Sequence, residues 1–585
     1  MTAEAARDAR RLSPARALAA LERIHTEFGT GMEPRKLALL GRLLSARFAT
    51  ADAVLRYHEA LCFLAAYPDS ARIDAQVRVN LAAFESRPDV RSHAEALASS
   101  GIAGTPIDYR FFWPMARWLA ARWPQSLHVD WDEFENADRL ESLLGLLVMP
   151  AEYPALDEFT RTPREWLAHM KCADETDAAF LVRRFGELPM DDRAREAIYD
   201  GLDVPMRLVP GTDTPSRTRA RTERVFDQPT GAWRRARVSR RDPIRYTTTP
   251  LDRRRPGLAA EIARPPATRL LSPAAGRELV ELARVSMVTR QRDLDAFAYA
   301  DARDVRLIDA GDGVQFACMG MIPERRLMFE TVYGFITLKN GVPVGYVLTS
   351  ALFGSSEIAY NVFDTYRGGE AARIYGRVIA ATAHLFGSDT FTIYPYQLGE
   401  DNDEALESGA WWFYWKLGFR PRDPQILRLA RREVARMKRK PGHRSSLATL
   451  RRLARANIYW SKGPDREDVI GRLSLANVGD AVTRAVARRF GSRREEASDT
   501  CAREAMTVLG VRSLAGWSPA QRAWWQHWAP LVCVLPGLGR WSPKARRALV
   551  HMIRAKGGPR EDEFVRRFDA HRPLRTAIRR LARGE

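Results

Sequence analysis

The chain has 585 residues, with 92 Lys and Arg against 72 Asp and Glu, and a formal net charge of +20. This length suggests three or four domains, and a hydrophobic content of 45% excludes a chain that is disordered throughout. The five cysteines are scattered without a Cys-x-x-Cys pair, which excludes a disulfide scaffold and a zinc ribbon and is typical of a reducing compartment.

The N-terminal segment does not have the pattern of a secretory signal. Glu4, Asp8 and Glu22 interrupt its apolar positions, so the segment predicts an amphipathic helix. No apolar run in the sequence reaches the ~18 residues that a membrane-spanning helix needs. We therefore expect a cytoplasmic protein with no membrane partner.

Residues 1–205 predict helices almost throughout, because apolar residues recur at helical spacing between turn signals. We interpret them as a helical region of unknown role. Residues 206–268 predict a linker or surface arm: thirteen Arg and only four acidic residues lie between Arg217 and Arg255, and five prolines interrupt the apolar pattern. Such a segment either contacts phosphate groups or is simply solvated.

Residues 269–425 predict a domain that contains both helices and strands. Ser272 followed by a proline predicts a helix start, and Asn340-Gly341 between two β-rich runs predicts a hairpin. The remaining expected elements follow in chain order: a third strand at 357–363, a helix at 371–386, a fourth strand at 390–394 and a second helix at 404–417.

Residues 426–585 predict a basic helical region. Segment 428–455 has eleven basic residues and one acid, Glu433, and the break at Pro441-Gly442 predicts two helices there. The fold class is therefore an α+β central domain between mainly α-helical N- and C-terminal regions.

The excess of Arg has two explanations. Only nine of the 92 basic residues are Lys, a bias that a GC-rich coding sequence produces without selection, whereas a selected positive surface would bind nucleic acid or another polyanion.

The central order of hairpin, strand, helix, strand and helix resembles the GNAT superfamily of N-acetyltransferases. The most specific part of the resemblance is the series Asn402, Ala410, Tyr414, Gly418 and Phe419 at the end of the second helix. The resemblance covers about 155 of the 585 residues. It implies a GNAT-like mixed sheet with flanking helices at 269–425 and an acyl-CoA-dependent N-acyltransferase acting on an unidentified amine.

Acyl transfer to an amine needs a neutral nucleophile and a proton for the departing thiolate. The resemblance places Tyr414 as the proton donor, since a phenol is still protonated at neutral pH; the alternative is a packed tyrosine whose hydroxyl only bonds to a neighbour. Glu357 and Glu330 are the candidates for a general base, and each has an alternative interpretation as a structural carboxylate.

The resemblance also implies a binding site for acetyl-CoA or another acyl-CoA. The strand before the cofactor loop would offer the backbone of Asn361, Val362 and Phe363 to the pantetheine arm. The pyrophosphate would bind at the start of the following helix, where unpaired N–H groups favour anions. The residues expected in that loop are Arg367, Gly368, Gly369, Ala371 and Ala372, and Asn402 completes the expected cofactor set.

This loop departs from the family pattern Arg/Gln-x-x-Gly-x-Gly/Ala. If Arg367 takes the first position, Glu370 replaces the central glycine, and a shift by one residue puts Tyr366 where Arg or Gln belongs. The alternative function is therefore a non-catalytic GNAT-like protein that binds nucleic acid through its Arg-rich segments. The ten histidines are dispersed, so we expect no metal site.

Overall fold

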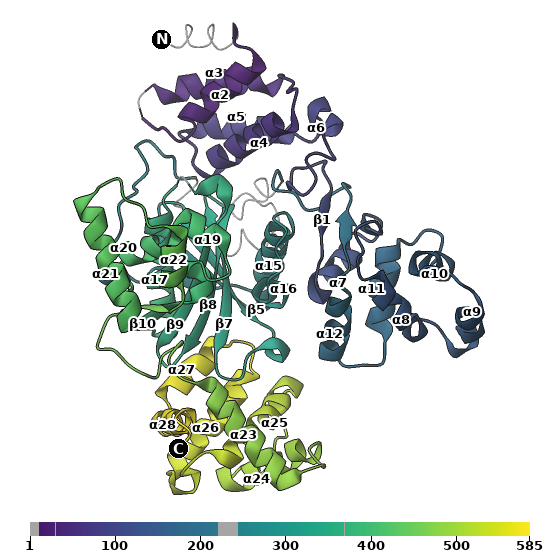
Figure 1. Ribbon diagram of the computed structural model, residues 1–585, viewed down its shortest axis with the longest axis vertical. Helices are drawn as coiled ribbons and strands as arrows, with labels where there is room; N and C mark the ends of the chain where they lie inside the picture. The colour runs from purple at the N-terminus through teal and green to yellow at the C-terminus, as the bar shows by residue number, and fades with distance from the viewer. Residues whose placement is uncertain (1–10, 30, 220–243, 368) are drawn as a thin grey trace.

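The computed structural model describes residues 11–29, 31–219, 244–367 and 369–585. Figure 1 shows four groups of elements: N-terminal helices at one end of the long axis, a large sheet in the middle, C-terminal helices at the other end, and a second helical group beside the sheet.

The first group consists of short capped helices. Ser13, Thr50 and Ser70 each accept a backbone N–H at the start of their helices, as N-caps do. The helices are α2 (Pro14–Ile24), α3 (Met32–Leu44), α4 (Ala51–Ala66), α5 (Ala71–Ala82) and α6 (Pro88–Ser92).

The second group has a small sheet at its base that the sequence analysis did not anticipate. Its three strands pair antiparallel in the order β1-β3-β2, and each is only three residues long, too short for an alternating apolar pattern to be visible. The elements are β1 (Ile107–Tyr109), α7 (Trp113–Arg122), β2 (Leu127–Val129), α8 (Ala137–Leu147), η1 (Pro150–Glu152), α9 (Tyr153–Glu158), α10 (Pro163–Met170), α11 (Asp177–Glu187), α12 (Asp192–Leu202) and β3 (Met206–Leu208).

Both ends of the expected linker 206–268 belong to folded parts of the chain. At its start Thr218 is buried, and its hydroxyl binds Nε2 of His58 at 2.8 Å. At its end lie α14 (Leu258–Ile262) and β4 (Ala267–Leu270), which join the central domain. Most of the Arg-rich stretch between them, 220–243, lies outside the described residues.

The central sheet has nine strands, where the sequence analysis expected four. They are β4, β5 (Ala300–Gly311), β6 (Val314–Met321), β7 (Thr331–Lys339), β8 (Val342–Leu352), β9 (Ser355–Val362), β10 (Thr390–Ile393), β11 (Arg420–Pro421) and β12 (Ile458–Ser461). Their spatial order is β11-β12-β10-β9-β8-β7-β6-β5-β4. Among the described strands, β9 and β10 form the one parallel pair, and every other neighbouring pair is antiparallel.

Several expected elements of this domain are present. Ser272 caps α15 (Pro273–Val288), α17 spans Ala371–Phe386, and Asn340 and Gly341 form the β7–β8 turn with φ values of 51° and 77°. The helix expected at 404–417 is instead two helices, α19 (Asp403–Ser408) and α20 (Ala410–Lys416), since Gly409 is left-handed at φ 67° and ends the first.

Helices cover both faces of this sheet (Figure 1). One face packs against α15, α16 (Asp295–Ala298) and α4, and the other against α17 and the aromatic helix α20. The remaining helical elements of the domain are η2 (Pro323–Arg325), η3 (Asp364–Tyr366), α18 (Pro395–Leu398), α21 (Pro424–Arg439) and α22 (Leu447–Ala454).

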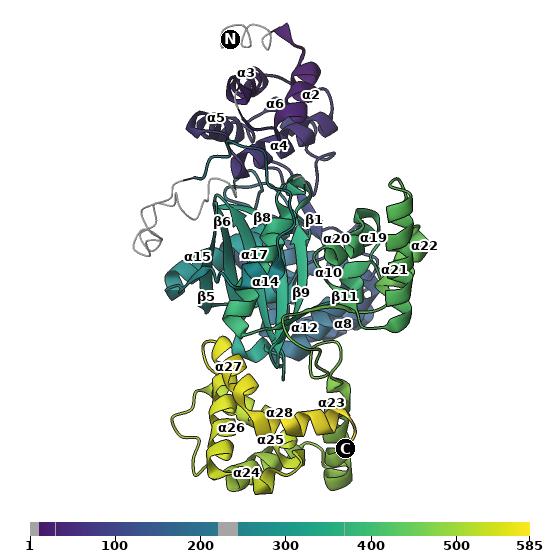
Figure 2. The same ribbon diagram turned by 90° about the vertical axis from the view of Figure 1, so that its left-hand side faces the viewer.

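The central domain extends past the expected boundary at 425, because β12 lies between β10 and β11. The helices α21 and α22 confirm the expected break near Pro441. The C-terminal group, below the sheet in Figure 2, consists of α23 (Leu475–Phe490), α24 (Glu496–Leu509), α25 (Pro519–Val534), η4 (Leu538–Arg540), α26 (Pro543–Lys556), α27 (Asp562–Ala570) and α28 (Arg572–Ala582). In the part of the chain that the structure describes, no helix is both long and apolar enough to cross a membrane.

Candidate functional site

The candidate site lies where β9 and β10 separate. The two strands pair only from Thr390–Ser355 to Thr392–Glu357. Beyond that point β10 ends at Ile393, while β9 continues to Val362 and stays paired with β8 on its other edge. The β9 edge from Ile358 to Val362 therefore has no partner strand among the described residues, and the backbone groups that point away from β8 are available to an extended ligand.

A cavity of about 230 Å³ lies at this separation, and we call it the fork cavity. Its lining combines predicted site residues with others that the sequence analysis did not single out. The predicted ones are Asn361, Val362, Arg367, Ala371, Asn402 and Tyr414. The others are Tyr360, Gln397, Glu404, Ala405, Ser408 and Phe413, and Ala410 of the series that carries the resemblance also lines the cavity.

Asn361 carries an unsatisfied polar atom in this wall. Its Oδ1 is buried and has no hydrogen-bond partner among the described residues. A buried acceptor without a donor costs free energy, so a ligand N–H or a water at this point would stabilise the cavity.

Tyr414 is held rigidly between aromatic rings. Its side chain is 3% exposed, and its ring centre lies 5.5 Å from that of Tyr375 and 5.8 Å from that of Phe419. Burial raises the pKa of the Tyr414 hydroxyl above its usual value, so it stays protonated and remains a proton donor at neutral pH.

The carboxylate of Glu370, in the loop before α17, is engaged away from the fork cavity. It forms ion pairs with Lys339 at 3.1 Å and with Arg373 at 3.0 Å, and Glu370 does not line the cavity. The backbone N–H groups of Ala371 and Ala372 begin α17 and have no acceptor among the described residues. Glu370 therefore does not compete for an anion at the helix start. A different carboxylate, that of Glu404, lies in the cavity lining and forms an ion pair with Arg367.

Gly369 and Ala372 do not line the fork cavity, and Gly368 lies outside the described residues. Gly369 has a packing role instead. A Cβ at Gly369 would lie 2.8 Å from the Tyr67 hydroxyl. The absence of a side chain therefore lets Tyr67, which follows α4 in the N-terminal helices, approach the loop.

Phe363 is separated from the other expected cofactor residues. It follows the end of β9, and its ring supports the guanidinium of Arg290, whose Cζ lies 3.7 Å from the ring centre. Phe363 lines a different cavity, described below.

Asn402 has a structural function that the sequence analysis did not consider. It is the N-cap of α19, where its Oδ1 accepts the Ala405 N–H at 3.1 Å, and its Nδ2 donates to the Tyr396 carbonyl at 3.1 Å. Both polar atoms of the amide are therefore satisfied by the protein, although the residue lines the fork cavity.

Glu357 and Glu330 lie near each other, at the start of the separation and outside the cavity lining. Burial, together with the nearby Glu330 carboxylate, raises the pKa of Glu357 to about 7. Burial also raises the pKa of Glu330, whereas the Lys556 ammonium acts in the opposite direction. A carboxylate that titrates near neutral pH has the proton affinity that a general base requires.

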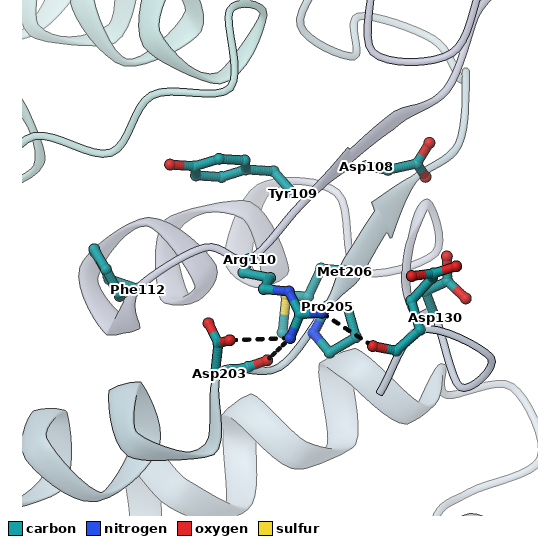
Figure 3. Close-up of a pocket in the computed structure, with 9 residues that line it drawn as sticks. Asp108, Tyr109, Arg110, Phe112, Asp130, Asp203, Pro205 and Met206 are labelled. Atoms are coloured by element: carbon teal, nitrogen blue, oxygen red, sulfur yellow. Dashed lines mark hydrogen bonds and ion pairs between the residues drawn. The ribbon is translucent and has the colours of Figure 1, made fainter. Parts of the chain in front are cut away.

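Two further features outside the central domain carry polar groups. In the cavity of Figure 3, of about 470 Å³, Arg110 binds the Asp203 carboxylate at 2.9 Å and the Glu133 carbonyl at 3.2 Å, so its charge is already neutralised. Cys501, Glu504 and Cys533 place three metal-ligating atoms within 4.8 Å of one another, but Arg489 binds both oxygens of the Glu504 carboxylate.

No protein-family model, curated protein or solved structure shows a significant match to this chain.

Proposed function

We propose that this protein is an acyl-CoA-dependent N-acyltransferase. The observation that carries the proposal is the fork cavity, where the free edge of β9, the start of α17 and the Tyr414 ring meet. Six residues expected from the resemblance line it, from segments that are far apart in the sequence.

The residues present suit a thioester co-substrate. The unpaired β9 edge at Val362 offers backbone hydrogen bonds to the amide groups of a pantetheine arm, and the orphaned Asn361 Oδ1 accepts one more N–H. The N–H groups of Ala371 and Ala372 suit a pyrophosphate, since a helix N-terminus favours an anion.

The reaction needs two proton transfers. The amine nitrogen attacks the thioester carbonyl and forms the C–N bond, and Glu357 takes the amine proton through water. The C–S bond then breaks, and Tyr414 gives its proton to the thiolate. With a pKa of about 7 for Glu357, turnover should rise as the pH increases through 7.

The first experiment is a calorimetric titration of the full chain with acetyl-CoA, propionyl-CoA and a long-chain acyl-CoA. Ala371→Trp places an indole in the fork cavity and should abolish binding. Ala435→Trp, on an exposed part of α21, is the matched control and should bind like the wild type. If no acyl-CoA binds to the wild type, or if Ala371→Trp binds equally well, the proposal is wrong.

Binding of nucleic acid or another polyanion is a second candidate, favoured by the surface of α21 and α22. Within the described chain, nearly all of the basic side chains there are exposed without a carboxylate partner; they include Arg428, Arg431, Arg432, Lys438, Arg439, Lys440 and Arg444. The charges lie close enough to act on one another, since Arg431 lowers the pKa of Arg420 in addition to the effect of burial.

Filter binding of tRNA and duplex DNA across a salt series tests this second function. Phosphate contacts predict that affinity falls steeply with salt, and that charge reversal at Arg431 and Arg432 reduces the slope. If affinity does not change with salt concentration, the excess of Arg reflects the composition of the coding sequence and this second function is wrong.

A further inference from the structure

A second large cavity lies where three groups of elements meet. It has a volume of about 530 Å³, and we call it the arginine cavity. Its walls come from α4, from the loops at 99–100 and at 217, from the end of α15, and from the segment that follows β9. The lining residues used below are Glu59, Arg217, Arg290, Arg292, Phe363 and Asp364.

Arg290 is a partly buried cation with no counter-ion among the residues that the structure describes. Its guanidinium lies on the Phe363 ring, and its Nη1 donates to the Ser286 carbonyl at 3.1 Å. Its Nε is buried and has no acceptor, and no carboxylate among the described residues forms an ion pair with it. Burial and the neighbouring Arg217 lower the pKa of Arg290 to about 10, so it is still charged at neutral pH.

Arg292, the next arginine along the chain, also lacks a carboxylate partner among the described residues. It lies beside Tyr346, with its Cζ 5.6 Å from the ring centre; burial raises the pKa of the Tyr346 hydroxyl, and the Arg292 charge opposes that rise. Tyr346 is the register partner of Asn361 on β9, so this wall of the arginine cavity adjoins a residue of the fork cavity.

The acids in the lining are already engaged. Glu59 binds Nη1 of Arg217 at 2.7 Å and accepts the Thr365 hydroxyl, while Asp364 is largely exposed and binds Arg367 at 2.7 Å. The charges of Arg290 and Arg292 therefore remain uncompensated. A buried charge without a partner is costly, and a guanidinium matches the two oxygens of a carboxylate or phosphate.

We propose that the arginine cavity binds the carboxylate or phosphate group of a small molecule, with Arg290 and Arg292 as its ligands. The two cavities are lined by neighbouring residues at the end of β9, since Val362 lines the fork cavity and Phe363, the next residue, lines the arginine cavity. The identity of this molecule rests on the proposed function. It is the acceptor, an amine that also carries an anionic group, and it is held so that its amine reaches the fork cavity.

The binding site itself is tested with simple anions. Calorimetry of the full chain at low salt, with inorganic phosphate and with succinate as probes, distinguishes the two ligand groups. At least one should bind to the wild type, and Arg290→Met should weaken it about 30-fold or more. Arg488→Met, which removes an exposed cation from α23, is the control and should change nothing.

Folding of the variant is checked separately. Arg290→Met removes a partly buried charge that has no ion-pair partner among the described residues, so its melting temperature without ligand should equal or exceed that of the wild type. If the melting temperature of Arg290→Met is lower than that of the wild type, Arg292→Met is used in its place in the same titrations. Binding of neither probe to the wild type, or equal binding to the arginine variants, would overturn the site.

The assignment as an acceptor site has its own readout. Arg290→Met should leave acyl-CoA binding unchanged, raise KM for amines that carry a carboxylate or phosphate, and leave KM for neutral amines unaltered. If the variant loses acyl-CoA binding, the cavity serves the CoA phosphates and the inference is wrong. If the probes bind but no acyl-CoA does, the anion site stands and the proposed acyltransferase function fails.

Discussion

Glu357 is the last residue of β9 that pairs with β10, and its partner there is Thr392. The pair marks the point where the only parallel ladder among the described strands ends and the free edge of β9 begins. It also places a half-buried carboxylate with a raised pKa at the start of the candidate site.

Glu357→Gln should change how stability depends on pH. Because the pKa of Glu357 is raised to about 7 in the folded chain, the wild type loses stability as the pH rises from the ordinary carboxyl range through 7. The glutamine variant does not, so we expect it to match the wild type near pH 5 and to exceed it at pH 8 by about 2 kcal/mol. Thermal and urea unfolding at the two pH values measures this difference. Glu467→Gln, at an exposed position, is the control. A stability difference between Glu357→Gln and the wild type that does not change with pH would contradict the prediction.

Tyr414→Phe should separate catalysis from binding. The variant keeps the ring packing and loses the hydroxyl, so acyl-CoA should bind normally while turnover falls by about 100-fold, as expected for loss of a general acid. Calorimetry and release of free CoA thiol measure the two effects.

The neighbouring Tyr375 provides a matched control for that variant. Its hydroxyl is buried and has no hydrogen-bond partner in the described part of the chain, and Tyr375 does not line the fork cavity. Tyr375→Phe should therefore retain turnover and fold with equal or slightly greater stability. Equal losses of turnover in the two variants would show that Tyr414 acts only through packing.

We expect Asn402 to stabilise α19 as its N-cap, and we expect a negative charge at this position to weaken ligand binding in the fork cavity. Asn402→Ala removes the acceptor for the Ala405 N–H and should cost about 1 kcal/mol of folding free energy. Asn402→Asp keeps the cap and should restore stability, while its negative charge in the cavity wall weakens acyl-CoA binding. Urea unfolding and calorimetry report the two effects. An Asp variant that binds acyl-CoA like the wild type would show that phosphate does not approach this residue.

The Lys339–Glu370 ion pair should stabilise the contact between the N-terminal helices and the cofactor loop. Both side chains are buried, and Lys339 also lies 5.0 Å from the Tyr67 ring centre. Glu370→Gln leaves the lysine charge buried without its partner and should cost about 3 kcal/mol. Adding Lys339→Met should recover most of the loss, as measured by urea unfolding. Additive losses in the double variant would mean that the pair does not act as a unit.

Local signals in the sequence were sufficient to predict many elements of the central domain. Ser272 before a proline, and Asn340-Gly341 between β-rich runs, set a helix start and a hairpin through interactions within a few residues. The strands β5 and β6 were missed, and so was β12, which returns to the sheet from beyond the basic helices. The pairing of β12 with β10 and β11 depends on partners distant in the chain, which no local pattern encodes. The β5–β6 hairpin is local, and the turn residues Asp312-Gly313 are the signal that could have predicted it.

The same division holds for the candidate site. By itself, the sequence determined the turns, the capped helices and the set of polar and aromatic residues around 357–419. Only the tertiary structure decided that Glu370 binds Lys339, that Phe363 supports Arg290, and that Arg290 has no counter-ion among the described residues. The two contacts join residues 31 and 73 positions apart, and burial and charge compensation depend on which distant segments meet in space.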